Sequence, residues 1–83
     1  MKELSTLKVF SADGCPHCNA LRADFKRRGV VYEEVNLSQH PQRLTEVRGL
    51  VWERRLPVVV DHERVSIGFN GGSSTFAALG LDD

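Results

Sequence analysis

Two cysteines three positions apart, in the segment Cys15-Pro16-His17-Cys18, constrain this chain more than any other feature of its sequence. They are the only cysteines among 83 residues, and a bond between them closes too small a loop to staple distant parts of the chain together. A secreted scaffold held by disulfides is therefore disfavoured. A close pair of this kind indicates redox chemistry or metal binding.

The composition indicates a globular chain that folds alone. Hydrophobic residues make up 41% of the sequence and charged residues 27%, without the charge excess of a disordered chain. The length fits one domain over residues 1–83, and we expect a monomer. Most tryptophans are at least half-buried, and we expect the same of Trp52, with a contact for a reductase partner as the alternative.

The charge pattern bears on partners and location. Eleven basic and eleven acidic residues cancel, and the basic residues are scattered, which disfavours nucleic acid as a partner. No apolar stretch approaches the roughly 20 residues that cross a bilayer, so we expect no membrane contact. The segment Met1-Lys2-Glu3 carries no apolar signal, and we place the protein in the cytoplasm.

Hydrophobic periodicity predicts seven elements along the chain. Segments rich in β-branched and aromatic residues are predicted strands, at 7–10, 30–37, 57–60 and 64–67, with a turn at 61–63 that makes the last two a hairpin. Segments with apolar residues at helical spacing are predicted helices, at 16–28, from 41 to between 48 and 52, and from a cap at 73 or 74 to a stop at 80.

The order of these elements, β-α-β-α-β-β-α, predicts the fold class. Two strands separated by a helix imply a right-handed parallel crossover, while the terminal hairpin adds antiparallel edges. We therefore expect an α/β protein of thioredoxin-like topology, with a mixed four-stranded sheet flanked by helices.

The predicted helix start gives the two cysteines different roles. Unpaired backbone N–H groups and the positive end of the helix dipole stabilise a thiolate there. We expect Cys15 to be the more exposed cysteine and the nucleophile, and Cys18, about one turn further in, to be the resolving thiol. Pro16 suits the first helical turn. His17 is expected to add positive charge or a hydrogen-bond donor beside Cys15, with an inert histidine as the alternative.

The segment Cys15-Pro16-His17-Cys18 after a first strand, Leu56-Pro57 before a third and Gly68 after a fourth resemble a glutaredoxin. The resemblance implies a thiol–disulfide oxidoreductase that reduces protein or glutathione mixed disulfides. It implies no bound cofactor, with glutathione as a candidate reductant. It also implies a cis peptide bond before Pro57, a trans proline at the start of an edge strand being the alternative.

The resemblance further implies a set of substrate- or glutathione-binding residues, Arg54, Leu56, Gly68 and Asn70. Arg54 falls three residues before Pro57, where the family often has a basic residue that meets a glutathione carboxylate. The backbone of Leu56 is expected to pair with a substrate.

Three positions differ from the pattern of the family. Ala12 stands where many members carry a lysine, His17 where tyrosine is usual, and Phe69 replaces the second glycine of a Gly-Gly turn. The segment 71–74 is expected to restore flexibility, and the helix start there to bind a carboxylate through backbone N–H groups, with a simple capped turn as the alternative. The electron source is thus open between glutathione and a thioredoxin reductase.

A metal or iron–sulfur carrier is the alternative from another class of protein. Cys15 and Cys18 would then be ligands, shared across a dimer. Two thiolates supply only half of a tetrahedral zinc shell, and His17, His40 and His62 lack the spacing of a zinc finger. We therefore expect no metal site.

Overall fold

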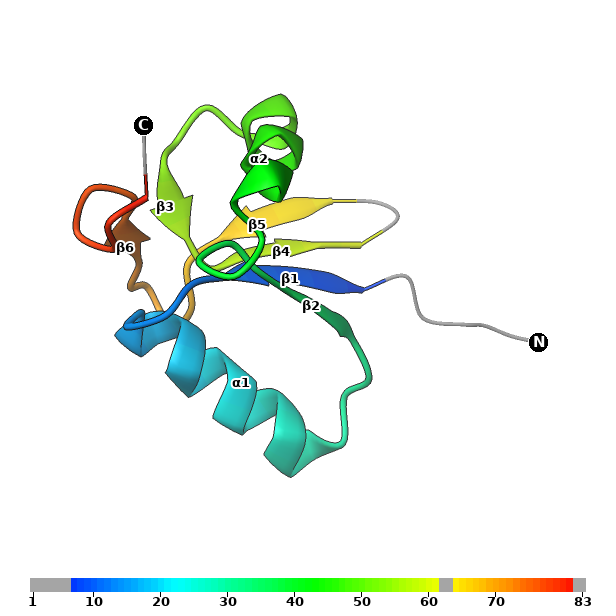
Figure 1. Ribbon diagram of the computed structural model, residues 1–83. Helices are drawn as coiled ribbons and strands as arrows, with labels where there is room; N and C mark the ends of the chain where they lie inside the picture. The colour runs from blue at the N-terminus through cyan, green and yellow to red at the C-terminus, as the bar shows by residue number, and fades with distance from the viewer. Residues whose placement is uncertain (1–6, 62–63, 82–83) are drawn as a thin grey trace.

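A four-stranded sheet forms the centre of the computed structural model, which describes residues 7–61 and 64–81 (Figure 1). The strand order is β2-β1-β4-β5. These strands are β1 (Lys8–Ser11), β2 (Glu33–Asn36), β4 (Val58–Val60) and β5 (Val65–Ile67). β1 runs parallel to β2 and antiparallel to β4, and β4 and β5 are antiparallel. The mixed four-stranded sheet predicted from the sequence is confirmed.

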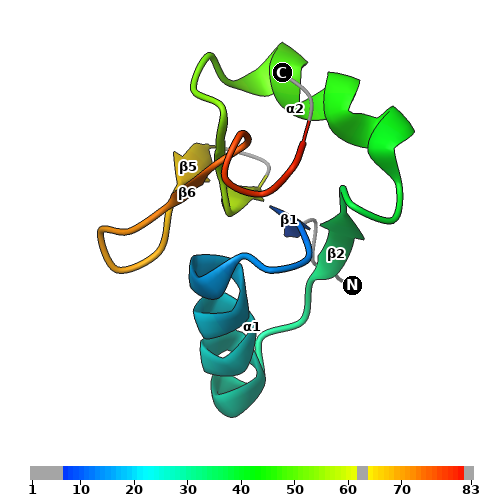
Figure 2. The same ribbon diagram turned by 60° about the vertical axis from the view of Figure 1, so that its left-hand side comes forward.

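Helices lie on both faces of this sheet, as the two views in Figures 1 and 2 show. One face carries α1 (Pro16–Arg28), and the other carries α2 (Leu44–Leu50), which continues from the 3-10 turn η1 (Pro41–Arg43). The second predicted helix is thus confirmed within its expected limits. A small antiparallel sheet of β3 (Arg55–Leu56) and β6 (Ser74–Thr75) adjoins the main one.

Residues of β1 connect the two layers because neighbouring side chains of a strand point to opposite faces. Val9 packs with Leu21 and Phe25 of α1. Phe10 belongs to a second buried cluster, which includes Val47 of α2. The core therefore lies on both faces of the sheet.

Helix α1 begins and ends where local sequence signals place it. Pro16 is its first residue, and Gly29 ends it in the left-handed conformation with φ 71°. The N–H of Val30 donates to the carbonyl of Phe25 at 2.9 Å, which satisfies one of the last carbonyls of the helix. The predicted start and stop are confirmed.

The second strand is shorter than the predicted segment 30–37. β2 has four residues, and its register with β1 runs from Lys8 opposite Glu33 to Ser11 opposite Asn36. The predicted hairpin of β4 and β5 is confirmed. Positions 62 and 63 of its turn lie outside the described residues.

The third predicted helix, after Ser73 or Ser74, is wrong. Ser74 and Thr75 pair with β3 instead, and residues 76–80 form hydrogen-bonded turns. The N–H of Leu81 donates to the carbonyl of Phe76 at 2.9 Å, which closes the segment after a single turn. A pairing between distant residues has thus overridden a local helix signal.

A polar cluster ties α1 to the sheet. Arg22 donates to the Glu34 carboxylate from Nε at 3.0 Å and from Nη2 at 2.6 Å, and the buried hydroxyl of Ser11 donates to the same carboxylate at 2.7 Å. The hydrogen bonds from Arg22 hold the pKa of Glu34 below its ordinary value, against an opposing effect of burial, and Ser11 adds to the lowering. The charged form of Glu34 is therefore favoured by folding.

We expect Glu34→Gln to lower the free energy of unfolding by about 1 kcal/mol at pH 7, because it removes a charged acceptor from Arg22 and Ser11. Since the pKa of Glu34 is lower in the folded state, its contribution is complete above the unfolded value of about 4.3 and is lost as the pH falls through the folded value. Urea unfolding at pH 7 and pH 3 measures both effects.

Glu33→Gln is the matched control, because the side chain of Glu33 is 59% exposed and lies 3.6 Å from Arg43. It should change stability by less than about 0.5 kcal/mol. Equal losses for the two variants, or a loss in Glu34→Gln that does not shrink at pH 3, would contradict this assignment.

Candidate functional site

Cys15 and Cys18 form a disulfide at the start of α1, with their Cα atoms 5.2 Å apart. Cys15 is the residue that caps the helix, and its Sγ accepts a hydrogen bond from the N–H of Cys18 at 3.1 Å. Cys18 lies in the first turn. The structure therefore places the pair at the loop-to-helix edge that the sequence predicts.

The expectation that Cys15 is the more exposed cysteine is wrong for this disulfide-bonded state. Cys15 is 0% exposed and Cys18 is 1% exposed. Both belong to the buried cluster that includes Leu56 and Phe76. Both sulfurs are thus covered by the fold.

The electrostatics of the helix start favour negative charge on Cys15. No acidic residue lies in the first turn of α1, whereas Lys26, Arg27 and Arg28 lie in its last turn. Within its first turn, α1 therefore has no carboxylate that neutralises the positive end of the helix dipole. Ala12, where many family members carry a lysine, is buried and adds no charge.

The peptide bond between Leu56 and Pro57 is cis, as the resemblance implies. Both residues are buried, and the carbonyl of Pro57 accepts a hydrogen bond from the N–H of Gly68 at 2.7 Å. Leu56 lies opposite Ser74 in the β3–β6 pair. The structure thus brings Leu56 and Gly68, two of the predicted binding residues, to the same proline.

A tight hairpin over residues 69–72 is a feature that the sequence reasoning missed. Phe69 and Gly72 exchange backbone hydrogen bonds of 2.8 and 2.9 Å across Asn70 and Gly71, whose φ values are 53° and 78°. Asn-Gly with positive φ at both positions is the signature of a type I′ turn, so the signal was present in the sequence. The expected flexible segment is instead hydrogen-bonded, and Asn70 lies exposed at its tip.

Gly72 of this hairpin lies against the imidazole of His17. A Cβ atom built on Gly72 would lie 2.5 Å from Nδ1 and 3.0 Å from Nε2 of that ring. His17 therefore packs on the hairpin and is half-buried. The alternative of an exposed, inert histidine therefore does not describe its position.

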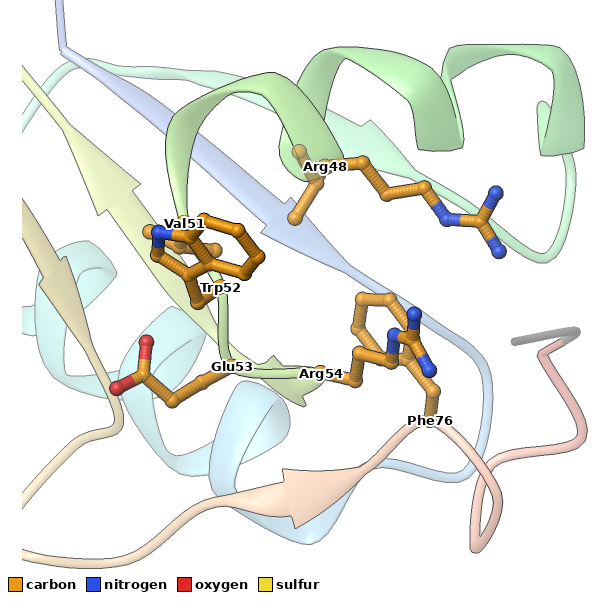
Figure 3. Close-up of a pocket in the computed structure, with 7 residues that line it drawn as sticks. Arg48, Val51, Trp52, Glu53, Arg54 and Phe76 are labelled. Carbon is orange, nitrogen blue, oxygen red and sulfur yellow. The ribbon is translucent and has the colours of Figure 1, made fainter.

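Arg54, the remaining predicted glutathione-binding residue, lines a separate cavity of about 290 Å³ (Figure 3). The cavity is formed by the end of α2, the segment that follows it and Phe76; its lining is Val47, Arg48, Val51, Trp52, Glu53, Arg54 and Phe76. Trp52 is 95% exposed, so the expectation that it is at least half-buried is wrong. The carbonyl of Arg54 accepts from the N–H of Phe76 at 2.8 Å.

Two features of residues 7–61 and 64–81 bear on other functions. No group of three or more His, Cys, Asp or Glu residues in these ranges could hold a metal ion. His62 lies outside them. None of the helices in the same ranges is long and apolar enough to cross a membrane.

Comparison with known proteins gives relatives of one kind. An uncharacterized glutaredoxin-like 8.6 kDa protein in the rubredoxin operon of Clostridium pasteurianum is 25% identical over 64 residues, which are 77% of this chain and 85% of that protein. The structure of NrdH-redoxin from Escherichia coli is similar with a TM-score of 0.69 and 25% identity, over 78% of this chain and 84% of that one.

The glutaredoxin grx-1 from Archaeoglobus fulgidus has the same fold, with a TM-score of 0.69 and 22% identity over 81% of this chain and 78% of that one. The thioredoxin-like fold class is thereby confirmed. The model of the glutaredoxin family matches residues 7–65. Because this match spans more than half of the sequence and includes the Cys15–Cys18 pair, the chain belongs to the glutaredoxin family.

Proposed function

We propose that the protein reduces disulfides of protein substrates, with Cys15 as the nucleophile and Cys18 as the resolving thiol. Membership of the glutaredoxin family supports thiol–disulfide exchange in general. The observation that carries the assignment of roles is the hydrogen bond from the N–H of Cys18 to Sγ of Cys15 at the start of α1. A thiolate on Cys15 would accept this bond more strongly than the disulfide sulfur does.

The reaction proceeds through two exchanges. In the reduced protein, the Cys15 thiolate attacks one sulfur of a substrate disulfide; the substrate S–S bond breaks and its leaving thiolate takes up a proton. Cys18 then loses its proton and attacks Cys15, which releases the second substrate thiol. The substrate gains two electrons and two protons, and the protein returns to the Cys15–Cys18 disulfide seen in the structure.

The proposed thiolate depends on few groups. The helix start supplies backbone N–H donors, and His17 supplies a hydrogen-bond donor or a positive charge within the same turn. The side chain of Ala12 supplies neither a hydrogen-bond donor nor a charge. We therefore assign thiolate stabilisation to the helix start, with a contribution from His17.

The protein is proposed to draw its electrons from a thioredoxin reductase rather than from glutathione. Glutathione carries two carboxylates, which are best bound by cations or by free backbone donors. Ala12 removes one cation of the family pattern. Phe69 replaces a glycine of the Gly-Gly turn, and its N–H already donates to Gly72.

We expect Cys18→Ser to accumulate protein partners bound through Cys15, because the second exchange has lost its nucleophile. Non-reducing electrophoresis and mass spectrometry of the purified variant, mixed with an oxidised model protein such as insulin, detect the adduct. Cys15→Ser is the control and should form none. Adducts of equal yield in both variants would contradict the assignment of roles, and a coloured, metal-loaded protein without exchange activity would support the carrier alternative.

We expect disulfide reduction to be at least about tenfold faster with NADPH and thioredoxin reductase than with glutathione and glutathione reductase, because Arg54 would have to bind glutathione without a second cation at position 12 and without the N–H of Phe69. NADPH consumption in the two coupled assays, at equal concentrations of this protein, measures the ratio. A glutathione-dependent rate equal to or above the other would overturn the choice of electron source and leave the exchange chemistry intact.

A further inference from the structure

The disulfide is inaccessible in the state that the structure shows. A thiolate that reduces it must make contact with a sulfur, and the rate depends on that access. Cys15 and Cys18 are 0% and 1% exposed. A neighbouring segment must therefore move before any thiol or substrate reaches Cys15.

Residues 68–75, here called the strap, adjoin the cysteine-bearing turn, because Gly72 lies against the ring of His17. The strap begins at the hydrogen bond from Gly68 to Pro57, passes through the Asn70-Gly71 turn and ends in β6. In Figure 2 it projects beside the first turn of α1. It is therefore attached to the cis proline at one end and adjoins the cysteine-bearing turn.

The end of the strap also covers the backbone edge assigned to a substrate. The carbonyl of Arg54 accepts from Phe76, so the backbone groups of Arg54 face the partner strand. Backbone groups of alternate residues in an antiparallel pair point to the same side, and Leu56 stands opposite Ser74. The backbone N–H and C=O of Leu56 therefore face β6. A substrate that pairs with the backbone of Leu56 must displace β6.

Gly72 is the residue through which the strap meets the active-site turn. A methyl group at this position would overlap the His17 ring, lying 2.5 Å from Nδ1. The φ of Gly72 lies outside the left-handed region, so an alanine there would not strain the backbone. Its effect would fall on the imidazole, which can rotate away because it is the end of a side chain.

We propose that Gly72 is a positioning residue that seats the His17 imidazole against the strap and thereby restricts the approach of thiols to Cys15. The inference rests on the proposed function. In the seated state, a small thiol reaches the disulfide more readily than a tripeptide or a protein does. Partners able to displace the strap gain access, so Gly72 and His17 contribute to substrate selection.

The test measures how fast the oxidised protein is reduced by 2-mercaptoethanol and by glutathione, with maleimide trapping and mass spectrometry. Gly72→Ala should raise the rate constant for glutathione at least about fivefold, and that for 2-mercaptoethanol by a smaller factor, because the displaced ring no longer holds the strap closed. In the His17→Ala background, Gly72→Ala should change either rate by less than about twofold, because the methyl group meets no ring.

Gly49→Ala is the matched control, since no atom lies within 4 Å of a Cβ built on this helical glycine. It should leave both rates unchanged. His17→Ala by itself should raise the ratio of the glutathione rate to the 2-mercaptoethanol rate, whereas a purely electrostatic effect of the imidazole would leave that ratio unchanged. The ratio therefore keeps the proposal testable if Gly72→Ala fails to fold.

Three results would overturn the proposal: slower reduction of Gly72→Ala, equal factors for the two thiols, or an effect of Gly72→Ala that persists undiminished without His17. These rates concern only the internal disulfide and need no substrate. A wild-type protein that reduces no substrate disulfide, but shows the expected pattern of rates, would refute the proposed function alone.

Discussion

The hydrogen bond from the N–H of Cys18 to Sγ of Cys15 is the interaction around which this small protein is arranged. It exists because α1 begins at Pro16, which has no N–H, and because the sulfur takes the capping role that serine or aspartate oxygens usually fill. The same bond ends the loop after β1 and directs a reactive atom into the positive end of the helix. The geometry of the helix start and the redox chemistry therefore require the same residue, Cys15, at this position.

The second constraint is that the sulfurs also serve as core atoms. A chain of 83 residues buries a modest core, and the two cysteines pack in it with Leu56 and Phe76. Cysteine behaves as a small hydrophobic residue when it is buried, so this packing stabilises the fold while it hides the reactive group. The reaction must then uncover the disulfide, and the strap, which adjoins the cysteine-bearing turn and carries no charged residue, is suited to being moved.

Local signals in the sequence predicted the elements whose structure depends on residues close together along the chain. Pro16 and Gly29 bound α1 as expected, and Leu56-Pro57 has the cis bond that the family pattern implies. The third helix failed because its first residues pair with β3, eighteen or more positions earlier in the chain, which no local pattern reveals. The burial of Cys15 was missed for a similar reason, since packing by distant segments decides it.

The hairpin at Asn70-Gly71 was missed although its signal is local. Phe69 stands where the family has the second glycine of its turn, but the glycine that matters physically lies three residues later, where Gly72 accommodates His17. Gly68 allows the backbone at residues 68 and 72 to approach closely, because a Cβ at position 68 would lie 2.8 Å from the carbonyl oxygen of Gly72. Under the proposed function, the strap offers no cation to a carboxylate, so steric access and backbone pairing, rather than a charged clamp, would discriminate among partners.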